Sequence, residues 1–192
     1  MSNHDVQATR RSNVNEAILQ AWECAFGRTR VIYLSGPITT GRRKIDSIRN
    51  RDGVSADDIT SQNCRILIEA ANRLREERGD LVVEPASLQI PGWSQQQYLT
   101  LWGELIKRHA HLVIFMPDWE YSVGCVTEYA MAKAEGIPTA TCSGKPLHSN
   151  EALELLSRAR ENIRTDIHHP QLKRLDDAIQ ATIRGIQING IS

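Results

Sequence analysis

Apolar residues occur along this chain in short runs and in helical stripes that alternate with one another. The run at residues 112–116 is hydrophobic throughout, which is typical of a central strand buried on both faces. Pro117 ends this run, and a polar turn over residues 118–122 follows it. The runs that predict strands lie at residues 31–34, 81–85, 112–116 and 137–142.

Between these runs, apolar positions three and four residues apart predict helices. Ser55 and Asp58 form a start that resembles a capping box, and Trp22 should pack the first helix against the body. We expect residues 1–11 to be loose, and residues 39–58 to form a polar flap beside a site. The expected helices lie at residues 12–26, 55–79, 94–109, 124–136, 150–163 and 170–188.

Strands that alternate with helices indicate βαβ crossovers. The expected fold is therefore α/β, a doubly wound parallel sheet of four to five strands with helices on both faces. The carboxyl ends of strands 31–34 and 112–116 should meet at the switch point, where such sheets bind ligands. We expect one domain over residues 1–192, with an N-terminal helical extension (1–29), a core (30–142) and C-terminal helices (143–192).

Charge and composition exclude several classes of function. Lys plus Arg and Asp plus Glu number 23 each, so the net charge is zero and neither a nucleic-acid polymer nor a membrane is an expected partner. The four cysteines and six histidines show no metal-ligand spacing, and no P-loop or G-x-G-x-x-G follows a strand. We expect a cytoplasmic protein with reduced thiols, no metal and no cofactor.

Polar and aromatic residues gather where the two strands should meet. Such a mixture suits a small ligand with an aromatic ring, hydroxyl groups and a phosphate. The first strand supplies Tyr33, Ser35, Gly36, Pro37 and the basic cluster Arg42, Arg43 and Lys44. The second strand and its turn supply Asp118, Trp119, Tyr121, Ser122, Gly124 and Glu128.

Each of these residues also has an ordinary structural explanation. Glu128, expected in or near the first helical turn, is either a carboxylate held ionised by the helix dipole, and so a nucleophile, or a plain helix-stabilising residue. Trp119 either stacks on a base or packs in the core. Ser122 either holds a hydroxyl or phosphate or only caps the helix. The basic cluster 42–44 is either part of the site or a solvated charged face.

Two motifs together resemble the nucleoside 2-deoxyribosyltransferase-like superfamily, which includes nucleoside 5′-monophosphate N-glycosidases. They are V-I-Y-L-S-G-P after the first strand and W-E-x-S-x-G-x-x-x-E-x-x-x-A after the strand at residues 112–116. The similarity covers residues 30–142. It implies a flavodoxin-like or Rossmann-like sheet and a homodimer or higher homo-oligomer. Trp22 of the N-terminal helix and the apolar positions after Asn150, beyond what a minimal sheet needs to cover, also favour an interface.

The resemblance implies a role for several residues. Glu128 would be the nucleophile that attacks the anomeric carbon, and Tyr33 would orient it. Ser122 and Gly36 would hold the sugar or phosphate end, and a serine rather than an aspartate at position 122 favours a 5′-phosphate. Trp119 would lie beside the base. The remaining candidates for substrate binding are Ser35, Pro37, Arg42 and Gly124.

The chain departs from the family pattern at the general acid that would protonate the departing base. The family has an aspartate where this chain has Gly103. Glu104 is the first candidate to replace it, although one step along a helix turns a side chain by roughly 100°. Asp118 is the substitute.

The expected function is cleavage of the N-glycosidic bond of a nucleoside 5′-monophosphate or nucleoside through a covalent glycosyl-Glu128 intermediate. The expected partner is a small nucleoside or nucleotide. Two alternatives stay open. One is a 2-deoxyribosyltransferase that exchanges bases, and the other is a non-catalytic nucleotide-sensing module, which the missing aspartate favours.

Overall fold

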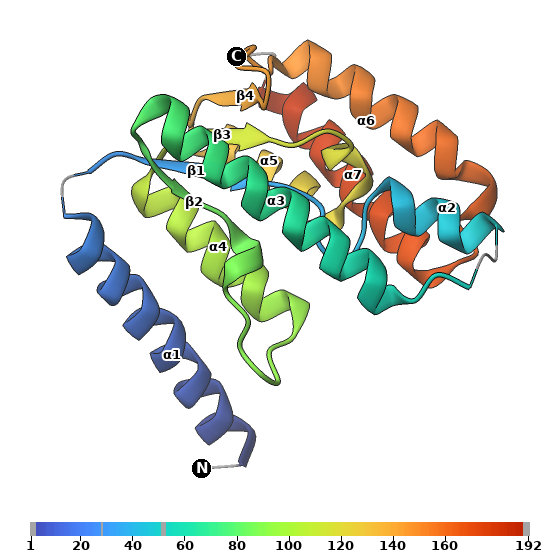
Figure 1. Ribbon diagram of the computed structural model, residues 1–192. Helices are drawn as coiled ribbons and strands as arrows, with labels where there is room; N and C mark the ends of the chain where they lie inside the picture. Colours follow the sequence, from blue (N-terminus) through green and yellow to red (C-terminus); the bar gives the residue numbers. More distant parts are fainter. Residues whose placement is uncertain (1–2, 28, 51–52, 190–192) are drawn as a thin grey trace.

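A parallel sheet of four strands forms the centre of the computed structural model, which describes residues 3–27, 29–50 and 53–189 (Figure 1). Its strands are β1 (Val31–Ser35), β2 (Leu81–Val83), β3 (Ala110–Phe115) and β4 (Thr139–Thr141), in the order β2-β1-β3-β4. The order reverses between β1 and β3, as in a doubly wound sheet. The predicted α/β fold is therefore confirmed.

Seven helices and three short 3-10 turns connect and cover the strands in the described part of the chain. Local capping sets several of the helix ends: Ser55 Oγ accepts from Asp58 N at 3.0 Å, and Gly79 closes the same helix at φ 67°. The helices are α1 (Asn3–Phe26), α2 (Arg42–Asn50), α3 (Ala56–Arg78), α4 (Gln95–His109), α5 (Val123–Ala134), α6 (Ser149–Ile163) and α7 (Pro170–Asn189). The 3-10 turns are η1 (Pro85–Ser87), η2 (Trp119–Tyr121) and η3 (Arg164–Asp166).

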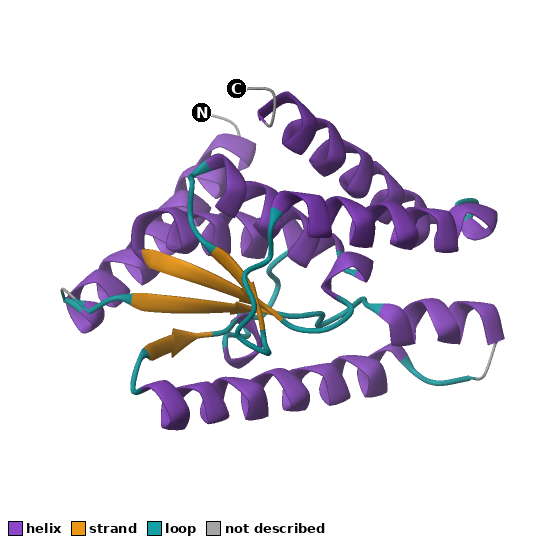
Figure 2. Ribbon diagram, turned by 90° about the horizontal axis from the view of Figure 1, so that it is seen from above, coloured by secondary structure: helices purple, strands orange, loops and turns teal. Residues whose placement is uncertain are grey.

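Helices cover both faces of the sheet, as predicted, but unequally (Figure 2). Val31 and Tyr33 of β1 join the large core formed with α1, α4, α5, α6 and α7. Ile32 and Leu34, the alternate residues, face the smaller core under α3. The two strands that flank the switch point end together, because Ser35 pairs with Phe115.

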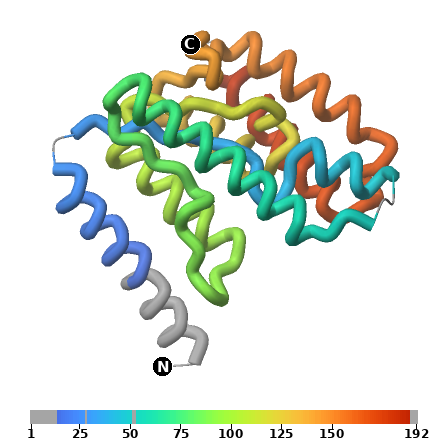
Figure 3. The backbone as a smooth tube through the Cα atoms, viewed as in Figure 1, coloured from blue at the N-terminus to red at the C-terminus, as the bar shows by residue number. Residues whose placement is uncertain are grey.

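Residues 3–11 are not loose, and the segment 39–58 is partly helical. The first helix begins at Asn3, so the segment 1–11 is helical wherever the structure describes its backbone. The segment 39–58 contains α2, because Ile45 and Ile48 lie on one side of a helical turn and pack against the large core. Trp22 does pack as predicted: its ring stacks on that of Trp102 at 5.4 Å between centroids, where α1 lies beside α4 (Figure 3).

The apolar residues of α6 and α7 do not indicate an interface. All but Leu153 of those that suggested one are buried within the chain, because the two helices pack on each other and α7 packs on α5, and Leu153 is partly buried against the same core. These residues therefore give no support to a homo-oligomer. The buried ones are Leu156, Ile163, Leu172, Leu175 and Ile179, each at most 3% exposed.

Candidate functional site

A buried carboxyl group lies where α5 passes the carboxyl end of β1. Glu128 is 5% exposed, and each of its carboxyl oxygens accepts a hydrogen bond from a side chain of β1. The Tyr33 hydroxyl donates to Oε1 at 2.7 Å, and Ser35 Oγ donates to Oε2 at 2.6 Å. Tyr33 and Ser35 are two residues apart on the strand, so both side chains point to the face that α5 covers. The carboxyl group is thus held at both oxygens.

Burial and hydrogen bonding act in opposite directions on Glu128. Burial raises the pKa of its carboxyl above the usual value, and the hydrogen bonds from Ser35 and Tyr33 offset part of this rise. Burial also raises the pKa of Tyr33 well above its usual value, so this hydroxyl keeps its proton and remains a donor.

Glu128 lies near the first turn of its helix, as predicted, but the prediction that the helix dipole holds it ionised is wrong. The helix α5 begins at Val123, which places Glu128 in the second turn. The effect of the dipole fades within the first turn. Neutral hydroxyl donors, rather than the helix end, are therefore what stabilises the ionised carboxylate.

The Glu128 carboxyl borders a cavity of about 630 Å³, which we call the Glu128 cavity. This volume is in the usual range for small-molecule sites. Its walls come from the segment after β1, the loop between β2 and α4, one face of α4 and the start of α5. Of the residues predicted for the site, those that line it are Gly36, Ser122, Gly124 and Glu128.

Ser122 has two contacts at the wall of this cavity. Its Oγ caps α5 by accepting from Cys125 N at 3.5 Å, and it also accepts from Thr40 Oγ1 at 3.0 Å. Gly124 follows in the first turn of α5 and lines the same wall. The helix cap and the proposed binding residue are therefore one side chain, beside backbone N–H groups that suit an anion.

Three aromatic residues of the wall were not assigned to the site from the sequence. Trp93, Tyr98 and Trp102 line the cavity, and the rings of Trp93 and Tyr98 meet edge to face at 5.2 Å between centroids. The Tyr98 hydroxyl accepts from Ile90 N at 2.7 Å and donates to Ile90 O at 3.2 Å, which holds the loop between β2 and α4. The available signal was the spacing of positions 95, 98, 99 and 102, which all line the cavity from one face of α4.

Trp119 does not lie beside the cavity, so its assignment to the base is wrong. It is 3% exposed and packs between Phe115 and Tyr129, at 5.0 Å and 4.9 Å between ring centroids. The cause is local: Asp118 adopts a left-handed conformation with φ 62°, and the η2 turn begins there. Trp119 is thereby part of the large core.

Neither candidate for the general acid lines the Glu128 cavity. Glu104 Oε2 accepts from Arg108 Nε at 3.1 Å on the outer side of α4, with its side chain 42% exposed. An added Cβ at Gly103 would come within 2.8 Å of Met131 Sδ, so position 103 faces α5. Asp118 lies beside Arg42 instead, with 4.0 Å between a carboxyl oxygen and the guanidinium. Both assignments as acid are therefore wrong.

A second, smaller hollow of about 200 Å³ adjoins the first and contains three further predicted residues, Pro37, Arg42 and Asp118. We call it the Arg42 hollow. The Arg42 guanidinium lies 4.0 Å from an Asp118 carboxyl oxygen and 5.3 Å from the centroid of the Tyr121 ring. The side chains of Arg42 and Asp118 are about half exposed. Pro37 and Arg42 therefore lie beside the Glu128 cavity and do not line it.

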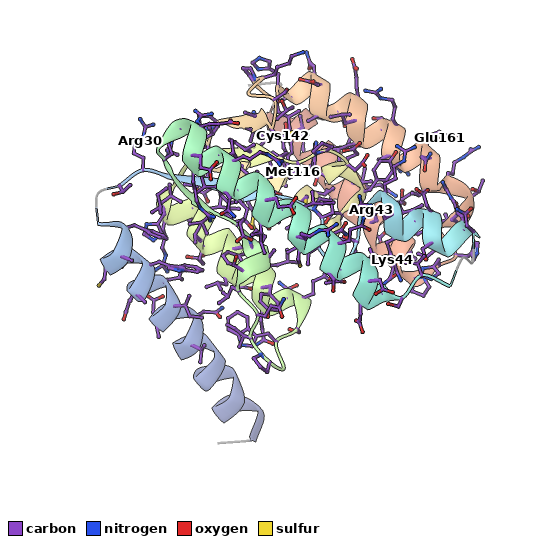
Figure 4. All side chains as sticks on the ribbon, viewed as in Figure 1. Arg30, Arg43, Lys44, Met116, Cys142 and Glu161 are labelled. Carbon is purple, nitrogen blue, oxygen red and sulfur yellow. The ribbon has the colours of Figure 1, made fainter. Side chains whose placement is uncertain are left out.

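The rest of the basic cluster is on α2, where Figure 4 labels Arg43 and Lys44. Arg43 Nη1 donates to Asn63 Oδ1 at 3.2 Å. Asn63 Nδ2 in turn donates to the carbonyl oxygens of Ile38 and Thr40, at 2.9 Å and 3.1 Å. Arg43 therefore helps to fix the loop after β1, between the two hollows.

The described residues form neither a metal site nor a membrane-spanning helix. Within residues 3–27, 29–50 and 53–189, no three His, Cys, Asp or Glu residues are grouped so that they could hold a metal ion. Over the same part of the chain, no helix combines the length and apolar character needed to cross a membrane.

Comparison with known proteins gives one match. A family model described as "Domain of unknown function (DUF4406)" matches residues 58–141, less than half of the chain. The matched part extends from α3 to β4, so it includes Ser122 and Glu128 but not Tyr33 and Ser35. Neither a curated protein nor a solved structure matches the chain.

Proposed function

We propose that this protein cleaves the N-glycosidic bond of a nucleoside 5′-monophosphate or nucleoside, with Glu128 as the nucleophile. One observation carries the proposal: a buried carboxyl group, hydrogen-bonded at both oxygens, borders a cavity that is large enough for a small ligand. The resemblance of the two motifs to the nucleoside 2-deoxyribosyltransferase-like superfamily supports it independently.

The chemistry proceeds in two steps. Glu128 attacks the anomeric carbon of the sugar, the bond to the base breaks, and a glycosyl ester forms on the carboxyl group. Water then attacks the same carbon and releases the sugar. Tyr33 and Ser35 act as positioning residues, because hydrogen bonds at both oxygens hold the carboxylate in one orientation before attack.

The cap of α5 is the proposed place for the 5′ end of the sugar. Ser122 Oγ and Thr40 Oγ1 lie together there, and the N–H groups of the first turn of α5 favour an anion. This arrangement supports a 5′-monophosphate over a free nucleoside. The same cavity is lined by Glu128 and by the aromatic residues Trp93, Tyr98 and Trp102.

A second candidate function is a module that binds a nucleotide without converting it. The observation in its favour is that neither Glu104 nor Asp118 lines the cavity. In that case Glu128 would serve only as an acceptor for ligand hydroxyl groups.

The test is a panel of ribonucleosides, deoxyribonucleosides and their 5′-monophosphates, incubated with and without a free acceptor base. Base released without an acceptor supports the hydrolase, and release only with an acceptor shows base exchange instead. A nucleotide that raises Tm, stays intact over hours and binds equally to Glu128→Ala would establish the binding module.

The homo-oligomer stays a prediction that rests on the resemblance. We expect at least a dimer by light scattering at micromolar concentration. A monomeric mass would contradict it.

A further inference from the structure

The Glu128 cavity contains one carboxyl group among the side chains that the structure describes. The other lining residues that titrate in water are Cys64, Tyr98 and Cys125. Burial raises the pKa of Cys64, and it raises the pKa of Cys125 to about 12. The proton of the Tyr98 hydroxyl is donated to Ile90 O. A general acid works best with a pKa near the working pH, which neither raised thiol offers, and the Tyr98 proton is already engaged at Ile90 O.

Glu120, which lies two residues before Ser122, does not line the cavity, and three other acidic residues near its walls in the sequence have their partners elsewhere. The Glu84 carboxylate, at the end of β2, accepts from Ala86 N at 2.6 Å, from Ser87 N at 3.1 Å and from Ser87 Oγ. Glu104 pairs with Arg108, and Asp118 lies in the Arg42 hollow. The described residues therefore give the cavity a nucleophile without an acid.

The requirement for an acid depends on the charge of the base. When the bond to the sugar breaks, the base keeps the electron pair. A neutral base becomes an anion unless a proton arrives, and this proton transfer is worth about 10²–10⁴-fold in rate. A base that already carries a positive charge, such as a pyridinium ring or an N7-alkylated purine, becomes neutral when it leaves. It needs no acid.

The aromatic part of the cavity wall suits a flat cation. Trp93, Tyr98 and Trp102 line it, and the faces of such rings attract cations. The carboxylate of Glu128, when ionised, also attracts a positively charged ring. No Lys or Arg side chain lines this cavity among the described residues, so nothing there repels a positive ring.

We infer that the substrate is a nucleotide whose base is a cationic aromatic ring. This inference rests on the proposed function and names its substrate class. In the step, a Glu128 carboxylate oxygen forms a bond to C1′ while the bond from C1′ to the ring nitrogen breaks, and the electron pair neutralises the ring. Water then attacks C1′ of the ester, which restores the carboxylate and releases one proton to solvent.

The experiment compares substrates that differ in the charge of the base. The panel contains the 5′-monophosphates of the common neutral bases, N7-methylguanosine 5′-monophosphate and nicotinamide mononucleotide. The N7-methylguanosine and guanosine compounds form a matched pair, because one methyl group makes the ring cationic. Rates measured with Glu128→Gln are subtracted to remove spontaneous loss of base.

We expect a kcat/KM for at least one cationic substrate that exceeds that of every neutral one by about 10²-fold or more. A neutral nucleotide cleaved as fast as the best cationic one would overturn this inference and leave the proposed function intact. Release of base from no member of the panel, cationic or neutral, would overturn both.

A variant of the aromatic wall gives a second readout. Trp93 lies on the loop between β2 and α4 and is only partly buried, so Trp93→Leu leaves the core intact. We expect it to raise KM for the cationic substrate about fivefold more than for its neutral match, while Trp93→Phe keeps most of the preference. An equal change for both members of the pair would contradict a cation-binding wall.

Discussion

The Glu128 cavity and the Arg42 hollow lie next to each other, share Gly36 and Thr40, and each contain a carboxyl group. Asp118 faces a cation at 4.0 Å in a half-exposed setting, whereas Glu128 is buried and bonded only to neutral hydroxyl groups. An exposed ion pair is worth about 0–1 kcal/mol and is ordinary on protein surfaces. A buried carboxyl group without a cation costs stability, and such groups concentrate at functional sites. The difference in burial and partner therefore favours Glu128 over Asp118 as the proposed nucleophile.

The largest expected effect separates these two carboxyl groups. Glu128→Gln keeps the shape of the side chain but removes the nucleophile, so we expect kcat for release of base to fall by about 10³-fold or more. Asp118→Asn is the matched control, with a change below about twofold. Equal losses of kcat in the two variants would show that burial does not distinguish the two carboxyl groups.

The next effect concerns the hydroxyl groups that hold Glu128. Tyr33→Phe removes one hydrogen bond to the carboxylate, and we expect kcat to fall roughly 10- to 100-fold. Because this hydrogen bond lowers the pKa of Glu128, its loss raises that pKa. The rising limb of the pH–rate profile should therefore move to higher pH. A lower kcat with an unmoved profile would show that Tyr33 does not act through Glu128.

A smaller effect concerns the loss of folding stability that the buried carboxyl group of Glu128 causes. Its pKa in the folded state lies above the usual value of 4.5, so the folded state loses stability as the pH rises from that value through the raised pKa. Glu128→Gln lacks this penalty. We expect its Tm to exceed that of the wild type by about 2–4 °C at neutral pH.

The same linkage fixes how this difference depends on pH. Below the usual glutamate pKa the carboxyl group is protonated in both the folded and the unfolded state, so the gain in Tm should disappear there. A thermal melt series across acidic and neutral buffers measures it. A variant that is less stable than the wild type at neutral pH would contradict the pKa direction.

The smallest effect belongs to the Arg42 hollow. Arg42→Ala removes a half-exposed ion pair, so we expect the free energy of unfolding to change by less than about 0.5 kcal/mol and KM by less than about twofold. The result that would change the comparison is a KM raised tenfold for a monophosphate but unchanged for the free nucleoside. That result would make the hollow the phosphate subsite.

The sequence predicted the fold well because its signals are local. Ser55 begins α3 and Gly79 ends it through hydrogen bonds within a few residues. Apolar runs that alternate with helical stripes predict the crossovers that place β1 and β3 side by side. The resemblance, rather than any local pattern, indicated that Tyr33 and Glu128 belong together. Their hydroxyl–carboxyl contact joins residues 95 positions apart, which a local pattern does not reveal.

The site residues that the sequence misplaced are those whose side-chain direction depends on small rotations along the backbone. Glu104 follows a residue that faces α5, yet its own side chain pairs with Arg108 on the outer side of α4. Trp119 follows a left-handed Asp118, which directs it into the core. Trp102 has the opposite outcome, since it belongs to the core and also lines the cavity. The order of residues fixes which element carries a side chain but not which cavity it reaches.

The most direct test of the central claim is to trap the glycosyl ester. A 2′-fluoro-arabinosyl nucleoside 5′-monophosphate slows hydrolysis of the ester, and mass spectrometry of the digested protein then locates the adduct. We predict one sugar phosphate on the peptide that contains Glu128, and no adduct on Glu128→Gln. Release of base with the sugar on another residue, or with no adduct under any condition, would contradict Glu128 as the nucleophile.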